Sequence, residues 1–265
     1  MFKKFRTTAL SAAMLGLAST AALAHFQLIY TPEAIHERAG EVPLKLIFWH
    51  PMENGHAMGM GEPEEFYLLH RGKKTDLSDT LKPISFEGRE GSAAAYDASV
   101  KLKRNGDYTL VAVPSPYYEE SEDIYIQQIT KVLLNKGEVP TDWMEPAGLK
   151  TEIVPLNKPY GGLVGSTFSG IVMSDGKPVA GAEIEIEYMA AEPDMDRNVP
   201  GPVTAEPVPG GAIVAITDAN GKFTFGIPKA GYWGFAALGV GPDTEHEGKE
   251  LSQDAVLWIH ANDLN

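Results

Sequence analysis

Residues 217–238 read TDANGKFTFGIPKAGYWGFAAL, and this stretch shows how the chain is built. Asn220-Gly221 is a strong signal for a tight turn, and Pro228 with Gly231 marks a second corner. The segments between these points are short and rich in aromatic and β-branched residues, as β-strands are. The stretch therefore predicts strand, turn, strand, corner and strand.

The same pattern extends through most of the chain, in which 27 Gly and 19 Pro place turns at short spacing. Leu44, Leu46, Phe48 and His50 share one face by the two-residue period of a strand. Antiparallel strands are predicted at 26–30, 42–49, 65–70, 94–102, 108–113 and 255–261. We expect an all-β fold of two antiparallel β-sandwich modules, not βαβ units.

One segment, 123–135, predicts a short helix in the N-terminal part. Ile126, Ile129, Val132 and Leu133 fall at helical spacing, and Gly137 follows as a terminator.

A second module begins near Phe168, and Asp175-Gly176 predicts a turn within it. We place the boundary near residues 159–162, which gives an N-terminal β domain at 25–163 and a C-terminal one at 164–265. Residues 190–211 are rich in Pro, Gly and acid and predict a solvated loop inserted in this module. The order of strands and turns resembles the transthyretin-like or carboxypeptidase-regulatory sandwich, a resemblance that concerns fold and not function.

The first 24 residues have the features of a secretory signal peptide. Lys3, Lys4 and Arg6 precede a short apolar stretch, and Ala22-Leu23-Ala24 has the small-x-small pattern of a cleavage site. The apolar stretch is too short to span a bilayer. We expect cleavage after Ala24 and a periplasmic protein.

Charge and cysteine content limit the partners and the ligands. Residues 25–265 carry 19 Lys and Arg against 36 Asp and Glu, a net charge of −17, which disfavours nucleic acid and anionic lipid as partners. There is no cysteine, so disulfides and thiolate metal ligands are excluded.

Cleavage after Ala24 would make His25 the N-terminal residue, whose free amine and imidazole can bind one metal ion together. Both groups lose their protons at modest cost near neutral pH. Signal peptidase tolerates many residues after the cleavage site, so a structural explanation of His25 stays open.

Residues 50–61 read HPMENGHAMGMG and offer His50, Glu53 and His56 as further metal ligands. Pro51 and Gly55 exclude a helical pair, so the loop would fold back on the end of a strand. Imidazole suits nickel, cobalt, copper and zinc, whereas the thioethers of Met52, Met58 and Met60 favour Cu(I). The alternative is a glycine-rich connection whose methionines cover a neighbouring strand.

The remaining histidines are expected to have ordinary roles: His70 at a strand end, His246 in a solvated turn and His260 in the core. The sequence contains no Gly-x-Ser-x-Gly elbow, phosphate loop or HExxH helix. We therefore expect a binding protein and not an enzyme.

Several stretches together resemble a family of exported bacterial proteins described as periplasmic components of nickel or cobalt uptake systems. They are AHFQLIY, HPMENGH, KPVAGAEIEIEY, the stretch quoted first and ELSQDAVLWIHA. The resemblance implies a C-terminal transthyretin-like module, Ni²⁺ or Co²⁺ as cargo and the membrane subunits of an energy-coupling-factor transporter as partners. The family's Ala-His matches Ala24-His25, and its His-Pro-x-Glu matches residues 50–53.

Three other functions remain open. A copper carrier would use the N-terminal histidine for Cu(II) and the methionine loop for Cu(I). A copper monooxygenase would need an exposed substrate platform, for which the sequence offers no flat aromatic surface. A structural or adhesive sandwich would bind no metal.

Overall fold

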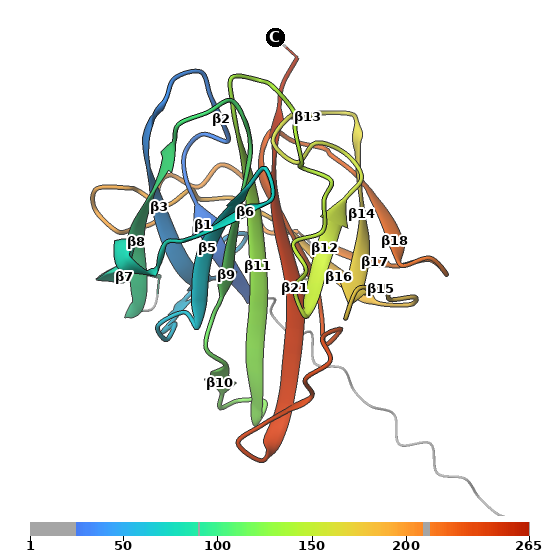
Figure 1. The fold of residues 1–265 in the computed structure, drawn as a ribbon. Helices are drawn as coiled ribbons and strands as arrows, with labels where there is room; N and C mark the ends of the chain where they lie inside the picture. The colour runs from blue at the N-terminus through green and yellow to red at the C-terminus, as the bar shows by residue number, and fades with distance from the viewer. Residues whose placement is uncertain (1–24, 90, 209–212, 265) are drawn as a thin grey trace, which may run out of the picture.

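Residues 25–89, 91–208 and 213–264 are described by a computed structural model, in which the chain forms three β-sheets (Figure 1). The first sheet has the order β1 (Phe26–Tyr30), β3 (Gly40–Trp49), β8 (Gly91–Leu102) and β7 (Lys82–Gly88), with β4 (Ala57–Met58) also paired to β3. The predicted signal peptide lies outside the described residues.

The central sheet has twelve strands. Its main path runs through β17 (Ile213–Ile216), β16 (Glu183–Tyr188), β19 (Gly231–Ala237), β21 (Lys249–Asn262), β11 (Ile124–Lys136), β9 (Gly106–Val113), β5 (Glu65–His70) and β6 (Lys73–Asp76). The short strands β2 (Ile35–His36) and β10 (Tyr117–Glu119) pair with β11, while β13 (Gly162–Leu163) and β20 (Glu245–His246) pair with β21.

The third sheet contains β12 (Thr151–Pro155), β14 (Thr167–Ser174), β15 (Lys177–Pro178) and β18 (Lys222–Gly226). The only helical element in the described ranges is a 3-10 turn, η1 (Ser78–Thr80). No helix in this part of the chain has the length and apolar character needed to cross a membrane. The all-β prediction is confirmed.

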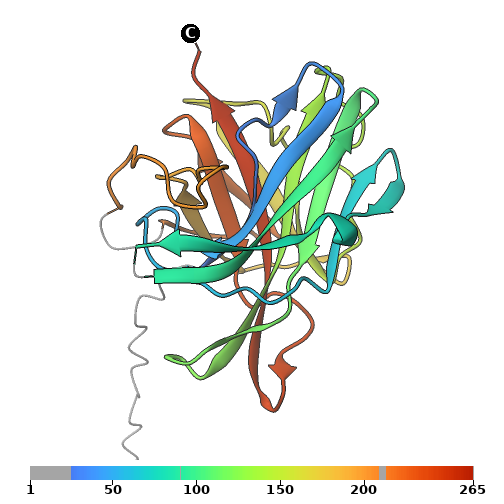
Figure 2. The same cartoon turned by 90° about the vertical axis from the view of Figure 1, so that its left-hand side faces the viewer.

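The central sheet is covered on both faces. On one face Trp258 of β21 contacts the ring of Phe26 in β1 of the first sheet, which lies over the central sheet at an angle to β21 (Figure 2). On the other face Phe235 of β19 packs against Phe168 and Phe223 of the third sheet. The result is two β-sandwiches that share the central sheet, with apolar side chains filling both interfaces.

A long parallel strand pair joins the two predicted domains. β11 and β21 lie side by side in register from Tyr125 opposite Leu251 to Val132 opposite Trp258, in the centre of Figure 1. In addition β12, which precedes the predicted boundary, pairs with β14 of the third sheet. The boundary at residues 163–164 therefore does not separate two sheets.

The helix predicted at 123–135 is wrong, because Ile124–Lys136 forms strand β11. This strand is covered on both faces, and its residues are buried almost without interruption from Ile126 onward. A strand buried on both sides does not alternate, so the apolar positions match a helical spacing by coincidence. The β-branched residues Ile, Thr and Val in this segment favour a strand over a helix, and this signal gives the correct structure.

The segment predicted as a solvated loop packs on the first sheet. Ala190 and Ala191 at its start are fully buried. The carbonyl of Asn198 accepts a hydrogen bond from the backbone N of Glu87 in β7, at 2.9 Å. The ammonium of Lys45 in β3 also contacts the side chain of Asn198. Residues 209–212, at the end of this segment, are not described.

Candidate metal centre

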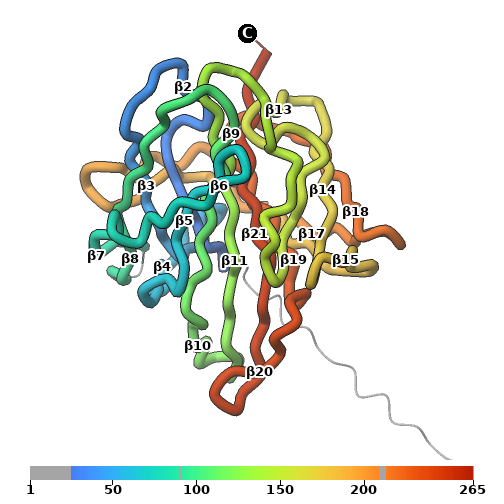
Figure 3. The backbone as a smooth tube through the Cα atoms, in the orientation of Figure 1, coloured from blue at the N-terminus to red at the C-terminus, as the bar shows by residue number. Residues whose placement is uncertain are grey.

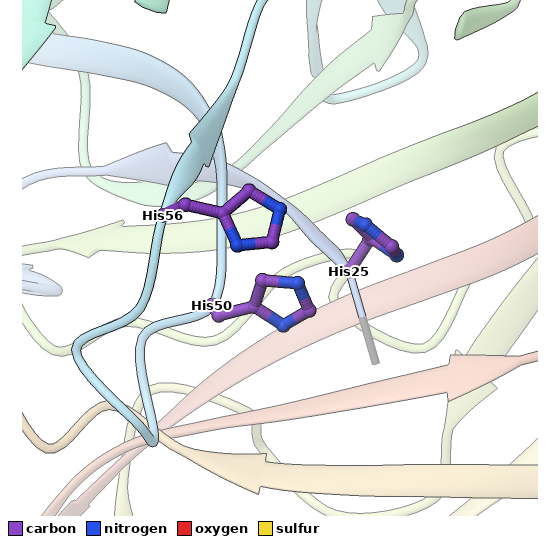
Figure 4. Close-up of side chains that lie close together, drawn as sticks. All are labelled: His25, His50 and His56. Atoms are coloured by element: carbon purple, nitrogen blue, oxygen red, sulfur yellow. The ribbon is translucent and has the colours of Figure 1, made fainter. Parts of the chain in front are cut away.

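Three histidines from separate segments converge at the lower end of the first sheet (Figure 4). His25 immediately precedes β1, His50 follows β3, and His56 immediately precedes β4. The ring centroids of His25 and His50 lie 4.4 Å apart, those of His50 and His56 5.0 Å, and those of His25 and His56 6.0 Å. The pairing of β1 and β4 with the same end of β3 brings the three rings together.

The loop between His50 and His56 is held by its own backbone. The backbone N of Gly55 donates to the carbonyl of His50 at 3.0 Å, and Nε1 of Trp49 donates to the carbonyl of Gly55 at 2.9 Å. A Cβ atom on Gly55 would lie 3.1 Å from Cβ of His50, so glycine allows the loop to close against the histidine. The start of the loop contacts the central sheet, where the backbone N of Met52 lies 3.4 Å from the carboxylate of Glu187 in β16.

His25 is fixed by the side chain of Gln128 in β11. Nε2 of Gln128 donates to the carbonyl of His25 at 2.6 Å, and Oε1 accepts from the backbone N of Gln27 at 2.7 Å. The amide thus pairs with the free edge of β1 as a neighbouring strand would. Nε2 also lies 3.2 Å from Oδ2 of Asp254. The other oxygen of this carboxylate, Oδ1, accepts hydrogen bonds from the backbone N of Gly239 and the hydroxyl of Ser252.

Burial keeps the imidazole of His25 neutral. Desolvation lowers the pKa of His25 to about 4, although the nearby carboxylate of Glu119 acts in the opposite direction and His56 adds to the lowering. Nε2 of His25 lies 3.4 Å from Oε2 of Glu119, a residue of β10. A neutral imidazole has a free lone pair for a metal ion near neutral pH, so the site needs little proton release to bind one.

The donor set fits one transition-metal ion. One ligand nitrogen from each histidine lies within 4.8 Å of the other two. Nitrogens bound to a common ion at about 2.1 Å would be roughly 3–4 Å apart, so small side-chain rotations suffice to close the set around it. Glu119 offers a carboxylate at the edge of the set.

Glu53 does not join the three histidines in the described structure. It lines a separate groove with Asn54, Glu87 and Arg89, on another side of the loop. Met52, Met58 and Met60 are at most 5 % exposed and belong to the hydrophobic core, where the thioether of Met60 lies 3.6 Å from the side-chain nitrogen of Gln27. The three methionines therefore pack against neighbouring strands, which was the alternative to metal ligation in the sequence analysis.

Sequence reasoning missed the groups that support the site. Glu119 lies in an acidic stretch, and Gln128 and Glu187 lie in strands whose partners are distant in sequence. No local pattern marks these residues, because each becomes relevant only when the sheets pack.

The other histidines lie away from the centre. His70 stacks on Tyr108 with the rings 4.1 Å apart, and His260 packs against the edge of Tyr232. His246 lies in β20, half-buried against Tyr125. His36 belongs to β2, 3.9 Å from the carboxylate of Glu33.

A sequence profile described as "Domain of unknown function (DUF4198)" matches residues 22–241, which include all three histidines. The chain belongs to the DUF4198 family. No curated protein matches it.

Among solved structures, the chain is similar to the D0-D1 domain of intimin, with 10% identity over 87% of this chain and 96% of that one, at a TM-score of 0.22. The adhesin InvE of Yersinia pseudotuberculosis gives 15% identity over 87% of this chain and 58% of that one, at a TM-score of 0.24. The fibronectin(III)-like modules of Clostridium thermocellum CbhA give 8% identity over 89% and 95%, at a TM-score of 0.20. Similarities with TM-scores this low do not indicate a function for the DUF4198 chain.

Proposed function

We propose that this protein binds one transition-metal ion through His25, His50 and His56. The observation that supports this is the convergence of three imidazoles, carried by three separate segments, with one nitrogen of each within 4.8 Å of the others. The depressed pKa of His25 supports it further, because the ring is unprotonated at neutral pH. The role is binding and not catalysis.

Nickel or cobalt is the proposed cargo, and a membrane uptake transporter is the proposed recipient. Imidazole ligands without thiolate suit both ions, and such a site can also release what it binds. The motif resemblance to periplasmic nickel and cobalt uptake components favours the same ions and a periplasmic location. The burial of Met58 and Met60 in the core favours these ions over Cu(I), which prefers thioethers.

In the processed protein the α-amine of His25 would become a fourth nitrogen ligand. Because the amine and the ring belong to one residue, both could bind the same ion in a compact chelate. This part of the proposal depends on cleavage after Ala24, so it is tested separately from the three rings.

The deciding experiment is calorimetric titration of Ni²⁺, then Co²⁺, into protein that begins at His25. We expect one ion per chain. His56→Ala should lose more than about 100-fold in affinity, because loss of a ligand should cost more than mutation of a residue that only positions a ligand. His246→Ala, a substitution of a half-buried histidine away from the centre, is the matched control and should bind normally. Absence of binding, or equal affinity in both variants, would reject the proposal.

A second protein with one extra residue before His25 isolates the amine. If it binds as tightly as the processed protein, the three rings alone form the site. If binding is lost while His246→Ala binds normally, the amine is a ligand as well.

A further inference from the structure

A groove of about 750 Å³ lies between the β5–β6 turn, the end of β8 and the β8–β9 turn. Five cations line it: Arg71, Lys73, Lys101, Lys103 and Arg104. They are more than a quarter of the 19 Lys and Arg in residues 25–265, a segment with a net charge of −17. Within the described ranges none of the five takes part in an ion pair.

The β5–β6 turn places its cations through backbone geometry. Arg71 and Gly72 have positive φ values of 50° and 71°, and His70 pairs with Lys73 across the turn, as in a two-residue hairpin. A nitrogen of the Arg71 guanidinium donates to the carbonyl of Asn105 at 3.1 Å. This bond ties the β5–β6 turn to the β8–β9 turn, so the two groups of cations border the same groove.

Tyr108 fixes the other cationic turn. Its hydroxyl accepts from the backbone N of Lys103 at 3.1 Å and of Arg104 at 3.0 Å, and it donates to the carbonyl of Arg104 at 2.7 Å. The ring of His70 stacks on Tyr108 at an interplanar angle of 12°. Nδ1 of His70 donates to the carbonyl of Asp107 at 2.7 Å, since that oxygen can only accept. Both turns are therefore anchored to one aromatic pair, in which Tyr108 is buried and His70 is half-buried.

The lining of the groove is amphiphilic. Leu68, Leu77 and Val100 supply buried apolar side chains, and Thr75 and Thr80 add hydroxyls. Glu41 is the one carboxylate among the described lining residues, and its Oε1 accepts from the hydroxyl of Ser99 at 2.6 Å. Positive charge thus dominates above an apolar surface.

We infer that this groove binds the phosphate group of an amphiphilic molecule, with the apolar part against Leu68, Leu77 and Val100. Gathered cations repel one another, and a bound anion offsets that repulsion. Arginine guanidinium and lysine ammonium are the side chains that bind phosphate in proteins. The volume lies in the range of small-molecule sites, about 300–1,000 Å³.

The groove is separate from the metal centre. Gly40 and Glu41, at one end of β3, pair with Leu102 and Lys101, whereas Trp49 at the other end pairs with Ala57 beside His56. A strand of ten residues spans roughly 30 Å, so the two sites lie at opposite ends of the first sheet. In Figure 3, β6 lies near the centre and β4 at the lower left. The inference does not depend on the proposed metal function.

The test is binding of phosphate probes to the protein that begins at His25. The probes are monomeric dihexanoyl phosphatidic acid, inorganic phosphate, and vesicles of phosphatidylglycerol and phosphatidylcholine in equal parts. The groove variant carries Lys73→Glu and Lys103→Glu, two exposed positions without ion pairs. The control carries Lys177→Glu and Lys222→Glu, exposed cations of the third sheet, so both proteins have the same net charge.

We expect the short-chain lipid to bind the parent and the control protein, and the groove variant to bind at least about tenfold more weakly. Equal affinity for inorganic phosphate would overturn the amphiphilic part of the inference, because the apolar lining would then contribute nothing. Selective binding of anionic vesicles would assign a lipid headgroup as the source of the phosphate. The inference is overturned if no probe binds or if both double variants lose affinity equally. An unchanged denaturant midpoint of the groove variant shows that it is folded, and this control does not depend on metal binding at the histidines.

Discussion

Gln128 joins the backbone of His25 to the carboxylate of Asp254, although the three residues come from three different strands or strand ends. Its Nε2 lies 2.6 Å from the carbonyl of His25 and 3.2 Å from Oδ2 of Asp254. The first ligand of the proposed metal centre is therefore positioned by the central sheet, in addition to its own pairing in the first sheet.

Gln128→Leu should weaken metal binding, although Gln128 is not itself a proposed metal ligand. The substitution leaves the carbonyl of His25 and the backbone N of Gln27 without their partner, so we expect about 10- to 100-fold lower affinity and a loss of about 1–3 kcal/mol in stability. Calorimetry and denaturant unfolding measure the two effects. Gln127→Leu is the matched control, because Gln127 is also buried in β11 but bonds Pro114 and Gln253. If both variants lose the same affinity, Gln128 has no positioning role.

Gly55→Ala should displace His50. A methyl group at this position would meet Cβ of His50 at 3.1 Å, which is tighter than an ordinary contact. We expect a loss of about tenfold or more in metal affinity. Gly59, which directly follows β4, has no atom within 4 Å of an added Cβ, so Gly59→Ala should bind as the parent does. Normal binding by Gly55→Ala would show that the loop adapts and that glycine is not required there.

The buried carboxylates of the central sheet should make the metal-free protein more stable in mild acid. Burial raises the pKa of Glu185 to about 7 and that of Asp254 to about 6, whereas unfolded carboxyls titrate near pH 4. The folded state binds more protons between these values, so this contribution is full below about pH 4 and is lost as the pH rises through about 6–7.

Glu185→Gln removes one of these titrations and should flatten the fall of the unfolding midpoint between about pH 5 and pH 8. Glu87→Gln, an exposed carboxylate of β7 in the first sheet, should follow the parent. Identical pH profiles for all three proteins would show that Glu185 has an ordinary pKa.

The buried ion pair between Lys131 and Glu152 connects the central and third sheets. Both side chains are at most 3 % exposed, so Lys131→Met leaves a buried carboxylate without its cation and should cost about 3–5 kcal/mol. Lys150→Met breaks the exposed pair with Asp243 and should cost about 1 kcal/mol or less. Denaturant unfolding compares the two, and similar losses would contradict the role assigned to burial.

The strands predicted from sequence are short apolar runs bounded by turn or polar residues. β1 and β5 have the predicted limits, and the Asp175-Gly176 turn joins β14 to β15 as expected. β11 was not predictable from apolar spacing, because its polar residues are satisfied by partners far away in sequence. Lys131, for example, is paired with Glu152 across two sheets.

The candidate site shows the same division. His25, His50 and His56 were identified because imidazole carries its chemistry in the residue type itself. Glu53 was included for its position between two histidines and for the His-Pro-x-Glu resemblance, but it lines another groove. Gln128 and Glu119 acquire their roles from packing, which no local pattern in the sequence records.

The parallel pairing of β11 with β21 also determines the order in which this chain can fold. Residues 125–132 have no neighbour on that side until residues 251–258 arrive, more than 100 positions later. A chain made from its N-terminus must therefore keep an apolar strand edge uncovered while the intervening segment is completed, a state prone to association with other chains. Such long-range pairing also slows folding. The interval before β21 joins the sheet is the period in which this protein most needs protection by a chaperone.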